Sequence, residues 1–139
     1  MIFRRLKKTD YIEYLQLISM FRETYFTEEQ FITTLNHIES ANSEIWVLCV
    51  DNDKLIGTGT LLFENKFIHN ISKIAHIEDI CVDSSYRGQG YGTKLIDFLI
   101  EHAKTKGCYK ITLYCKEELE KFYELNGLKR NSIQMALYM

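Results

Sequence analysis

Proline is absent from this chain, and no stretch has the Pro, Gly or Ser enrichment of a flexible linker. Internal repeats and low-complexity tracts are missing as well. A length of 139 residues falls within the usual range of one folded unit. We therefore expect a single domain that spans residues 1–139.

The chain also lacks a large excess of charge of either sign. Lys and Arg total 17 and Asp and Glu total 19, which gives a formal charge of −2. This balance disfavours nucleic acid and anionic membranes as partners, because both attract strongly basic surfaces. No apolar run approaches the roughly 18 residues of a membrane span, and the first residues turn polar too early for a signal peptide. We expect a soluble, cytoplasmic protein.

Cysteine is scarce, with four residues at positions 49, 81, 108 and 115, and no two of them form a C-x-x-C pair. Zinc sites use ligand pairs at short spacing, which neither the cysteines nor the four histidines supply. The favoured interpretation is that the cysteines are free thiols in the core. We expect no metal, and reduced thiols fit a cytoplasmic location.

Hydrophobic periodicity divides the chain into strands and helices. It predicts strands at residues 2–6, 45–50, 55–63, 73–83, 108–115 and 128–138. It predicts helices at residues 10–22, from Thr27 onward, 91–106 and 117–126. Thr27-Glu28-Glu29-Gln30 matches a capping box. This order indicates an α/β fold, with a mixed central sheet of six or so strands and helices on both faces.

The segment Arg87-Gly88-Gln89-Gly90-Tyr91-Gly92 joins a predicted strand to a predicted helix. Free N–H groups and the helix dipole attract an anion at such a junction, and glycines allow its close approach. The spacing differs from the dinucleotide fingerprint, and no Lys-Ser/Thr follows as in a P-loop. The favoured interpretation is a pyrophosphate-binding loop, and the alternative is a turn whose glycines serve geometry alone.

Two adjacent acids, Glu78 and Asp79, lie inside an apolar strand. Neighbouring side chains on a strand point to opposite faces, so one carboxylate should face inward, where an unpaired charge is costly. A bulge at this pair would turn both acids toward one cleft. The alternative is an edge strand with one acid in solvent and the other in an ion pair. Tyr123 lies on a short predicted helix, where an aromatic residue usually belongs to the core, and near the loop it is also a candidate general acid.

These segments resemble those of a known superfamily. Arg87 to Gly92 is similar to the Q/R-x-x-G-x-G/A acetyl-CoA motif of the GNAT acetyltransferases. The runs His76–Val82, Gly107–Leu113 and Lys121–Glu124 resemble one branch, the eukaryotic-type glucosamine-6-phosphate N-acetyltransferases. The resemblance covers residues 60–139 well and the first 45 residues only in element order.

The resemblance implies that a bulge near Glu78 and Asp79 splays the strand there. It also implies direct attack of the amine of an amino-sugar phosphate on acetyl-CoA, the co-substrate, in a homodimer. It implies cofactor contacts by Ile80, Cys81, Val82, Arg87, Gly88, Gln89, Gly90, Tyr91, Gly92 and Thr93. It further implies that Glu78 and Asp79 bind the sugar and help to accept the amine proton. By the same resemblance, Tyr123 donates to the departing sulfur, and Lys66 and His69 contact the sugar phosphate.

Three positions depart from the family pattern. Tyr138 stands where an arginine usually reaches the sugar phosphate across a homodimer, Tyr114 replaces an acidic residue, and Leu119 replaces an asparagine.

The sequence leaves two alternative functions open. One is a GNAT enzyme for another small amine, such as a polyamine, an aminoglycoside or a peptide N-terminus. The other is a degenerate domain that binds acetyl-CoA and serves as a sensor or interaction module.

Overall fold

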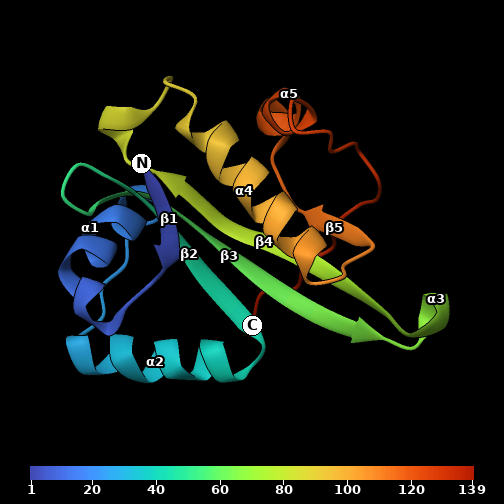
Figure 1. Cartoon of the computed structure of the whole chain (residues 1–139), viewed down its shortest axis with the longest axis horizontal. Helices are drawn as coiled ribbons and strands as arrows, with labels where there is room; N and C mark the ends of the chain where they lie inside the picture. The colour runs from blue at the N-terminus through green and yellow to red at the C-terminus, as the bar shows by residue number, and fades with distance from the viewer.

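The computed structural model describes residues 1–139, and a twisted sheet runs through its middle (Figure 1). The strands are β1 (Ile2–Arg5), β2 (Ser43–Val50), β3 (Lys54–Lys66), β4 (Ser72–Val82) and β5 (Lys110–Leu113). They lie in the order in which they occur in the chain. The first four pair antiparallel and β5 pairs parallel to β4, so the sheet is mixed as expected.

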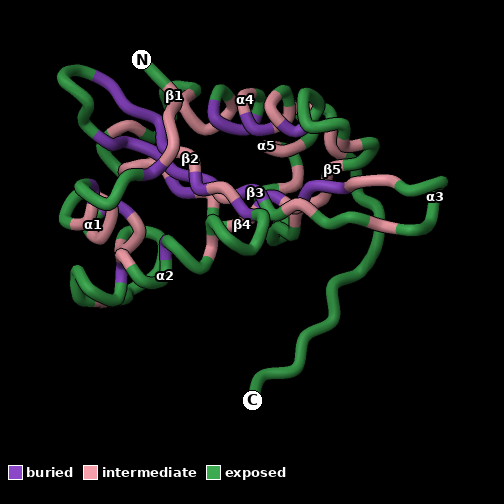
Figure 2. The backbone as a smooth tube through the Cα atoms, turned by 60° about the horizontal axis from the view of Figure 1, so that its bottom comes forward, coloured by how far each residue is buried: buried purple, intermediate pink, exposed green.

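Helices cover both faces of the sheet (Figure 2). One face carries α1 (Tyr11–Phe21) and α2 (Glu28–Ser40), and the other carries α4 (Tyr91–Thr105) and the short α5 (Glu120–Glu124). The short segment α3 (Ile68–Ile71) forms the tip of the β3–β4 hairpin, and single 3-10 turns occupy Lys8–Asp10, Ser84–Tyr86 and Glu117–Leu119. None of the helices combines the length and the apolar character that a membrane span requires.

The predicted periodicity places the correct side chains in the core. Phe31 and Leu35 of α2 are buried against the sheet, together with Leu17 of α1. On the opposite face, Leu95 and Leu99 of α4 are fully buried. The predicted capping box is also present, because the Thr27 hydroxyl accepts from the Gln30 N–H and the Gln30 side chain accepts from the Thr27 N–H.

The predicted bulge in β4 is confirmed. Thr58 of β3 faces Cys81 and Thr60 faces Glu78, so Gly59 alone lies opposite two residues, Asp79 and Ile80. Asp79 has a φ of 52°, in the left-handed region that residues other than glycine rarely adopt. A Cβ at Gly59 would lie 2.5 Å from the Ile80 Cδ1 atom. The glycine therefore leaves room for the side chain that the bulge redirects.

Three predicted elements differ in the structure. The expected strand at 128–138 does not form, so the sheet has five strands instead of six. A strand is held by hydrogen bonds to a neighbouring strand, whereas this segment runs away from the body of the chain with its apolar side chains exposed (Figure 2). The expected 117–126 helix is reduced to a 3-10 turn followed by α5, and the expected 108–115 strand shortens to Lys110–Leu113.

Candidate active site

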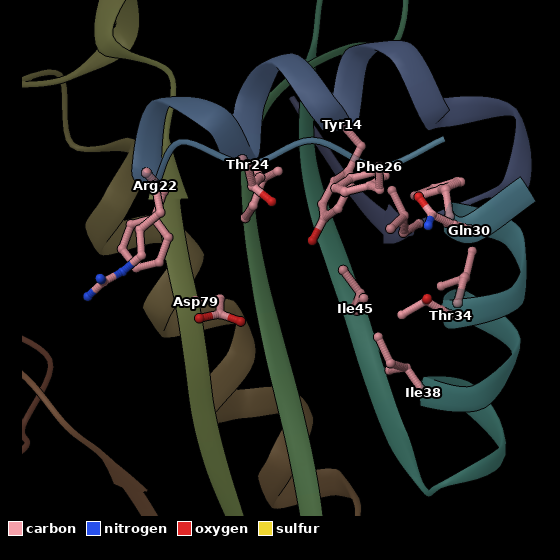
Figure 3. A pocket seen from close by; sticks show the side chains of 14 residues that line it. Tyr14, Arg22, Thr24, Phe26, Gln30, Thr34, Ile38, Ile45 and Asp79 are labelled. Atoms are coloured by element: carbon pink, nitrogen blue, oxygen red, sulfur yellow. The ribbon is translucent and has the colours of Figure 1, made fainter. Parts of the chain in front are cut away.

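The bulge turns both acids toward the α1–α2 face of the sheet. Ile77 packs into the α4-side core, so Glu78, the next residue, points to the other face. Without the bulge Asp79 would return to the α4 side, but it lines a pocket on the α1–α2 side instead (Figure 3). Burial, and then the nearby charge of Asp79, raises the pKa of Glu78 above its ordinary value. Glu78 is thereby suited to accept a proton.

The pocket that Asp79 lines lies between α1, α2 and the sheet and has a volume of about 330 Å³. Its walls are mainly apolar, with Tyr14, Thr24 and Gln30 among the polar residues. Burial, together with the charge of Asp79, raises the pKa of Tyr14 to about 12, so its hydroxyl stays protonated at neutral pH. The size falls in the range of small-molecule sites.

The glycine loop leads into α4 as predicted. Gly88 and Gly90 have φ values of 75° and 84°, and a Cβ at either position would meet no atom within 4 Å. Gly90 is the N-cap residue of α4, and no side chain caps the helix there. The N–H groups of the first turn are therefore available to an anion. Arg87 lies beside them, with its Nε atom donating to the Val82 carbonyl at 2.9 Å.

Gly92 has a different role, since a Cβ there would lie 3.0 Å from the Phe122 ring. This glycine allows α5 to pack closely against the first turn of α4. Asn126 strengthens the same contact, because its side-chain amide donates to the Thr93 carbonyl at 3.2 Å. No signal in the sequence predicts this role of Asn126, because an asparagine before a glycine is typical of an ordinary helix end.

The edge of β4 next to the loop is open. Pairing with β5 stops at Ile77–Leu113, so residues 78–82 have no β5 partner on that side. Ile80 and Val82 lie on this stretch, as does Cys81, whose buried thiol donates to the Leu17 carbonyl. The Cys81 side chain therefore faces the core, and only its backbone is available at the edge. An extended chain can pair here like an added strand.

Tyr123 lies in α5, on the α4 side of the sheet. It is half-buried and packs edge-on against Phe122, with ring centroids 4.9 Å apart. Burial raises the pKa of Tyr123 above its ordinary value, so the phenol remains a proton donor at neutral pH. Through Phe122 and Asn126, α5 is attached to the start of α4. Tyr123 thus lies in the element that adjoins the glycine loop.

Lys66 and His69 do not join the acids within one chain. Both lie at the tip of the β3–β4 hairpin, where Lys66 pairs with Glu64 at 2.8 Å and the His69 ring lies 4.8 Å from that of Tyr109. Thr60 faces Glu78, and the stretch of β3 from Thr60 to Lys66 spans about 20 Å at about 3.3 Å per residue. A small sugar cannot touch both ends of this stretch.

Comparison with known proteins decides the family. Residues 11–127 match the model of the acetyltransferase (GNAT) family. The chain belongs to this family. Among relatives of this GNAT chain, a glucosamine 6-phosphate N-acetyltransferase of Arabidopsis thaliana is 40% identical over 116 residues, which are 81% of this chain and 77% of that protein. A Dictyostelium discoideum enzyme, glucosamine 6-phosphate N-acetyltransferase 1, is 38% identical over 91% of this chain and 82% of its own length.

The fold of this GNAT chain agrees with that of a solved relative. The crystal structure of the Arabidopsis thaliana glucosamine-6-phosphate N-acetyltransferase superposes with a TM-score of 0.92 at 36% identity, covering 99% of this chain and 97% of that one. The family assignment and the overall fold therefore agree. No group of three or more His, Cys, Asp or Glu side chains is arranged to hold a metal ion.

The raised pKa of Glu78 generates a stability prediction. A carboxyl whose pKa is higher in the folded state than in the unfolded state destabilises the fold once it is charged, and this cost disappears as the pH falls below the unfolded value of about 4.3. We expect Glu78→Gln to raise the melting temperature at pH 7.5 and to change it little at pH 4.

Differential scanning fluorimetry at the two pH values measures this effect. Glu118→Gln, at an exposed position in the turn before α5, is the control and should shift neither melting temperature. A lower melting temperature for Glu78→Gln at pH 7.5 would mean that the charged carboxylate stabilises the fold through a partner.

Proposed function

We propose that this enzyme transfers the acetyl group of acetyl-CoA to the amine of glucosamine 6-phosphate, giving N-acetylglucosamine 6-phosphate. The observation that carries the proposal is the pair Glu78 and Asp79, turned by a bulge to one face beside an open strand edge. The names of the relatives from Arabidopsis thaliana and Dictyostelium discoideum support the substrate.

The residues around the loop fit acetyl-CoA. The pyrophosphate fits the first turn of α4, where Gly88 and Gly90 leave open space and Arg87 adds a positive charge. The extended pantetheine arm fits the unpaired edge formed by the backbone of Ile80 to Val82. Gln89, Tyr91, Gly92 and Thr93 complete the loop, with Gly92 acting through its contact with α5. Bound acetyl-CoA supplies the thioester that the amine attacks.

The chain's own side chains then handle the protons. Glu78 accepts the proton that the amine must lose, which its raised pKa favours. Asp79, on the same face, attracts and orients the amine. Tyr123 donates a hydrogen bond or a proton to the departing thiolate from the α5 side. The attack of the amine on the thioester thus has a base, Glu78, on one side and an acid, Tyr123, on the other.

The proposal includes a homodimer. Residues 128–139 carry apolar side chains at Ile133, Met135 and Leu137 that are at least 85% exposed, and their alternation is typical of a strand without a partner. β5 is an edge strand, which a second chain can extend. We propose that Lys66 and His69 reach the sugar phosphate of a second copy.

Light scattering tests the homodimer. It should give twice the chain mass of 16.4 kDa, and a monomer mass at micromolar concentration would contradict the homodimer.

The proposal also includes a cytoplasmic location. All four cysteines are free, and Cys49 and Cys81 are buried among apolar side chains. Free thiols persist in reducing compartments, which supports this location.

Thiol release from acetyl-CoA tests the function. The amines are glucosamine 6-phosphate, glucosamine, spermidine and a peptide with a free N-terminus. We expect the highest kcat/KM with glucosamine 6-phosphate. Only this amine offers both an amine for Asp79 and a phosphate for the proposed contacts from Lys66 and His69 of a second copy. A preference for spermidine or the peptide would support another small-amine enzyme. Acetyl-CoA binding without thiol release from any amine would support a binding module.

Tyr123→Phe tests the proposed acid. The substitution keeps the ring against Phe122 and removes only the hydroxyl. We expect kcat at saturating acetyl-CoA to fall about 100-fold, the low end for a general acid, because a thiolate leaves fairly readily. The melting temperature should change little. The matched control is Tyr25→Phe at an exposed position, which should keep the wild-type rate. A decrease in kcat of less than about threefold would indicate that Tyr123 serves only as a core aromatic residue.

A further inference from the structure

The pocket on the α1–α2 face contains two charged side chains of opposite sign. Asp79 is the only acid that lines it and Arg22 is the only cation. Figure 3 shows that both lie at the same end of the pocket as Thr24, with the Arg22 guanidinium directed outward at the rim, whereas Thr34 and Ile38 lie at the other end. A ligand that carries a positive and a negative group therefore finds a counter-charge for each at this end.

Arg22 differs from the other arginines because its guanidinium has no protein acceptor. The other four each donate to a carboxylate or carbonyl oxygen: Arg4 to Asp10 and Asp53, Arg5 to Glu44, Arg87 to Val82 and Arg130 to Glu120. The Arg22 guanidinium makes no ion pair and no hydrogen bond within the chain, and lies 5.8 Å from the centroid of the Phe21 ring. It is free to bind an anion.

The backbone around Arg22 fixes the direction from which the side chain extends. Helix α1 ends at Phe21, and Arg22 follows in an extended conformation with its N–H donating to the Ile18 carbonyl at 3.0 Å. Phe21 and Ile18 also line the pocket. The guanidinium therefore extends from an anchored backbone position at the end of a helix.

We propose that Arg22 binds the phosphate of the amino-sugar phosphate and sets the preference for phosphorylated over unphosphorylated sugars; this inference rests on the proposed function. A guanidinium donates two parallel hydrogen bonds to phosphate oxygens, which a lysine cannot match. Asp79 attracts the amine of the same molecule. Arg22 is the cation that the chain itself contributes to this pocket, since Lys66 lies about 20 Å from Glu78 along β3.

The test compares kcat/KM for glucosamine 6-phosphate and for glucosamine in the wild type and in Arg22→Gln. Loss of a charged hydrogen-bonded contact should lower kcat/KM for the phosphorylated sugar about 10- to 100-fold, mainly through KM. The value for glucosamine should stay within about twofold, and KM for acetyl-CoA should not change. The kcat/KM of Arg22→Lys for glucosamine 6-phosphate should fall between those of the wild type and Arg22→Gln, because lysine keeps the positive charge and loses the paired hydrogen bonds of the guanidinium. The control Lys8→Gln, at an exposed lysine before α1, should keep wild-type values for both sugars.

The outcomes separate this inference from the proposed function. A wild type that prefers glucosamine 6-phosphate, with an Arg22→Gln variant that keeps the same preference ratio, would overturn the role of Arg22 alone. Equal losses for both sugars would do the same, because they would indicate a structural role. A wild type that acetylates neither sugar would overturn the proposed function and, with it, this inference.

Discussion

One extra residue in β4 determines how the rest of the site is arranged. In a regular strand, Glu78 and Asp79 would lie on opposite faces of the sheet. The register shift opposite Gly59 places them on the same face and moves Ile80 against α4. Beyond the last β5 pair, at Ile77, β4 and β5 no longer hydrogen-bond. The common orientation of the two acids and the unpaired edge of β4 thus both begin at the bulge.

This arrangement carries costs that the surrounding core offsets. A left-handed φ at a non-glycine residue such as Asp79 costs on the order of 1–3 kcal/mol. The charge of Glu78 is disfavoured by burial, as its raised pKa records. Apolar clusters on both faces of the sheet hold β3 and β4 in place despite these terms. Local strain persists only where neighbouring packing determines the backbone, and it gathers at functional sites.

Local signals in the sequence were sufficient for part of the fold and of the site. The Thr27–Gln30 capping box and the stripe that includes Leu95 and Leu99 depend on residues a few positions apart, so spacing alone predicted them. The two acids in an apolar strand left a bulge and an edge strand as alternatives, and the family resemblance favoured the bulge that the register of β3 against β4 shows. The 128–138 segment has the alternation of a strand, but pairing depends on a neighbour that alternation does not supply.

Local sequence patterns could not predict how far apart the site residues lie in space or which side chains lack a hydrogen-bond partner. Lys66 and His69 match a family segment, yet only the register of β3 against β4 shows how far along the hairpin they lie from Glu78. Arg22 follows a helix, where a solvated cation is common, and nothing in the sequence distinguishes it from Arg4 or Arg5. Its unpaired guanidinium and its place in the pocket emerge only once the ion pairs of the other arginines are known.

The two faces of the sheet give the proposed reaction a direction. Glu78 and Asp79 face the α1–α2 side, whereas Tyr123 belongs to the cluster on the α4 side. The stretch of β4 without a β5 partner lies between them. An amine attacking a thioester at this edge approaches from the acid side, and the sulfur departs on the other side, toward the phenol. Base and acid then never compete for the same proton, because the sheet separates them. A single bulge therefore orients the nucleophile, while the divergence of β4 from β5 gives the leaving group its own exit.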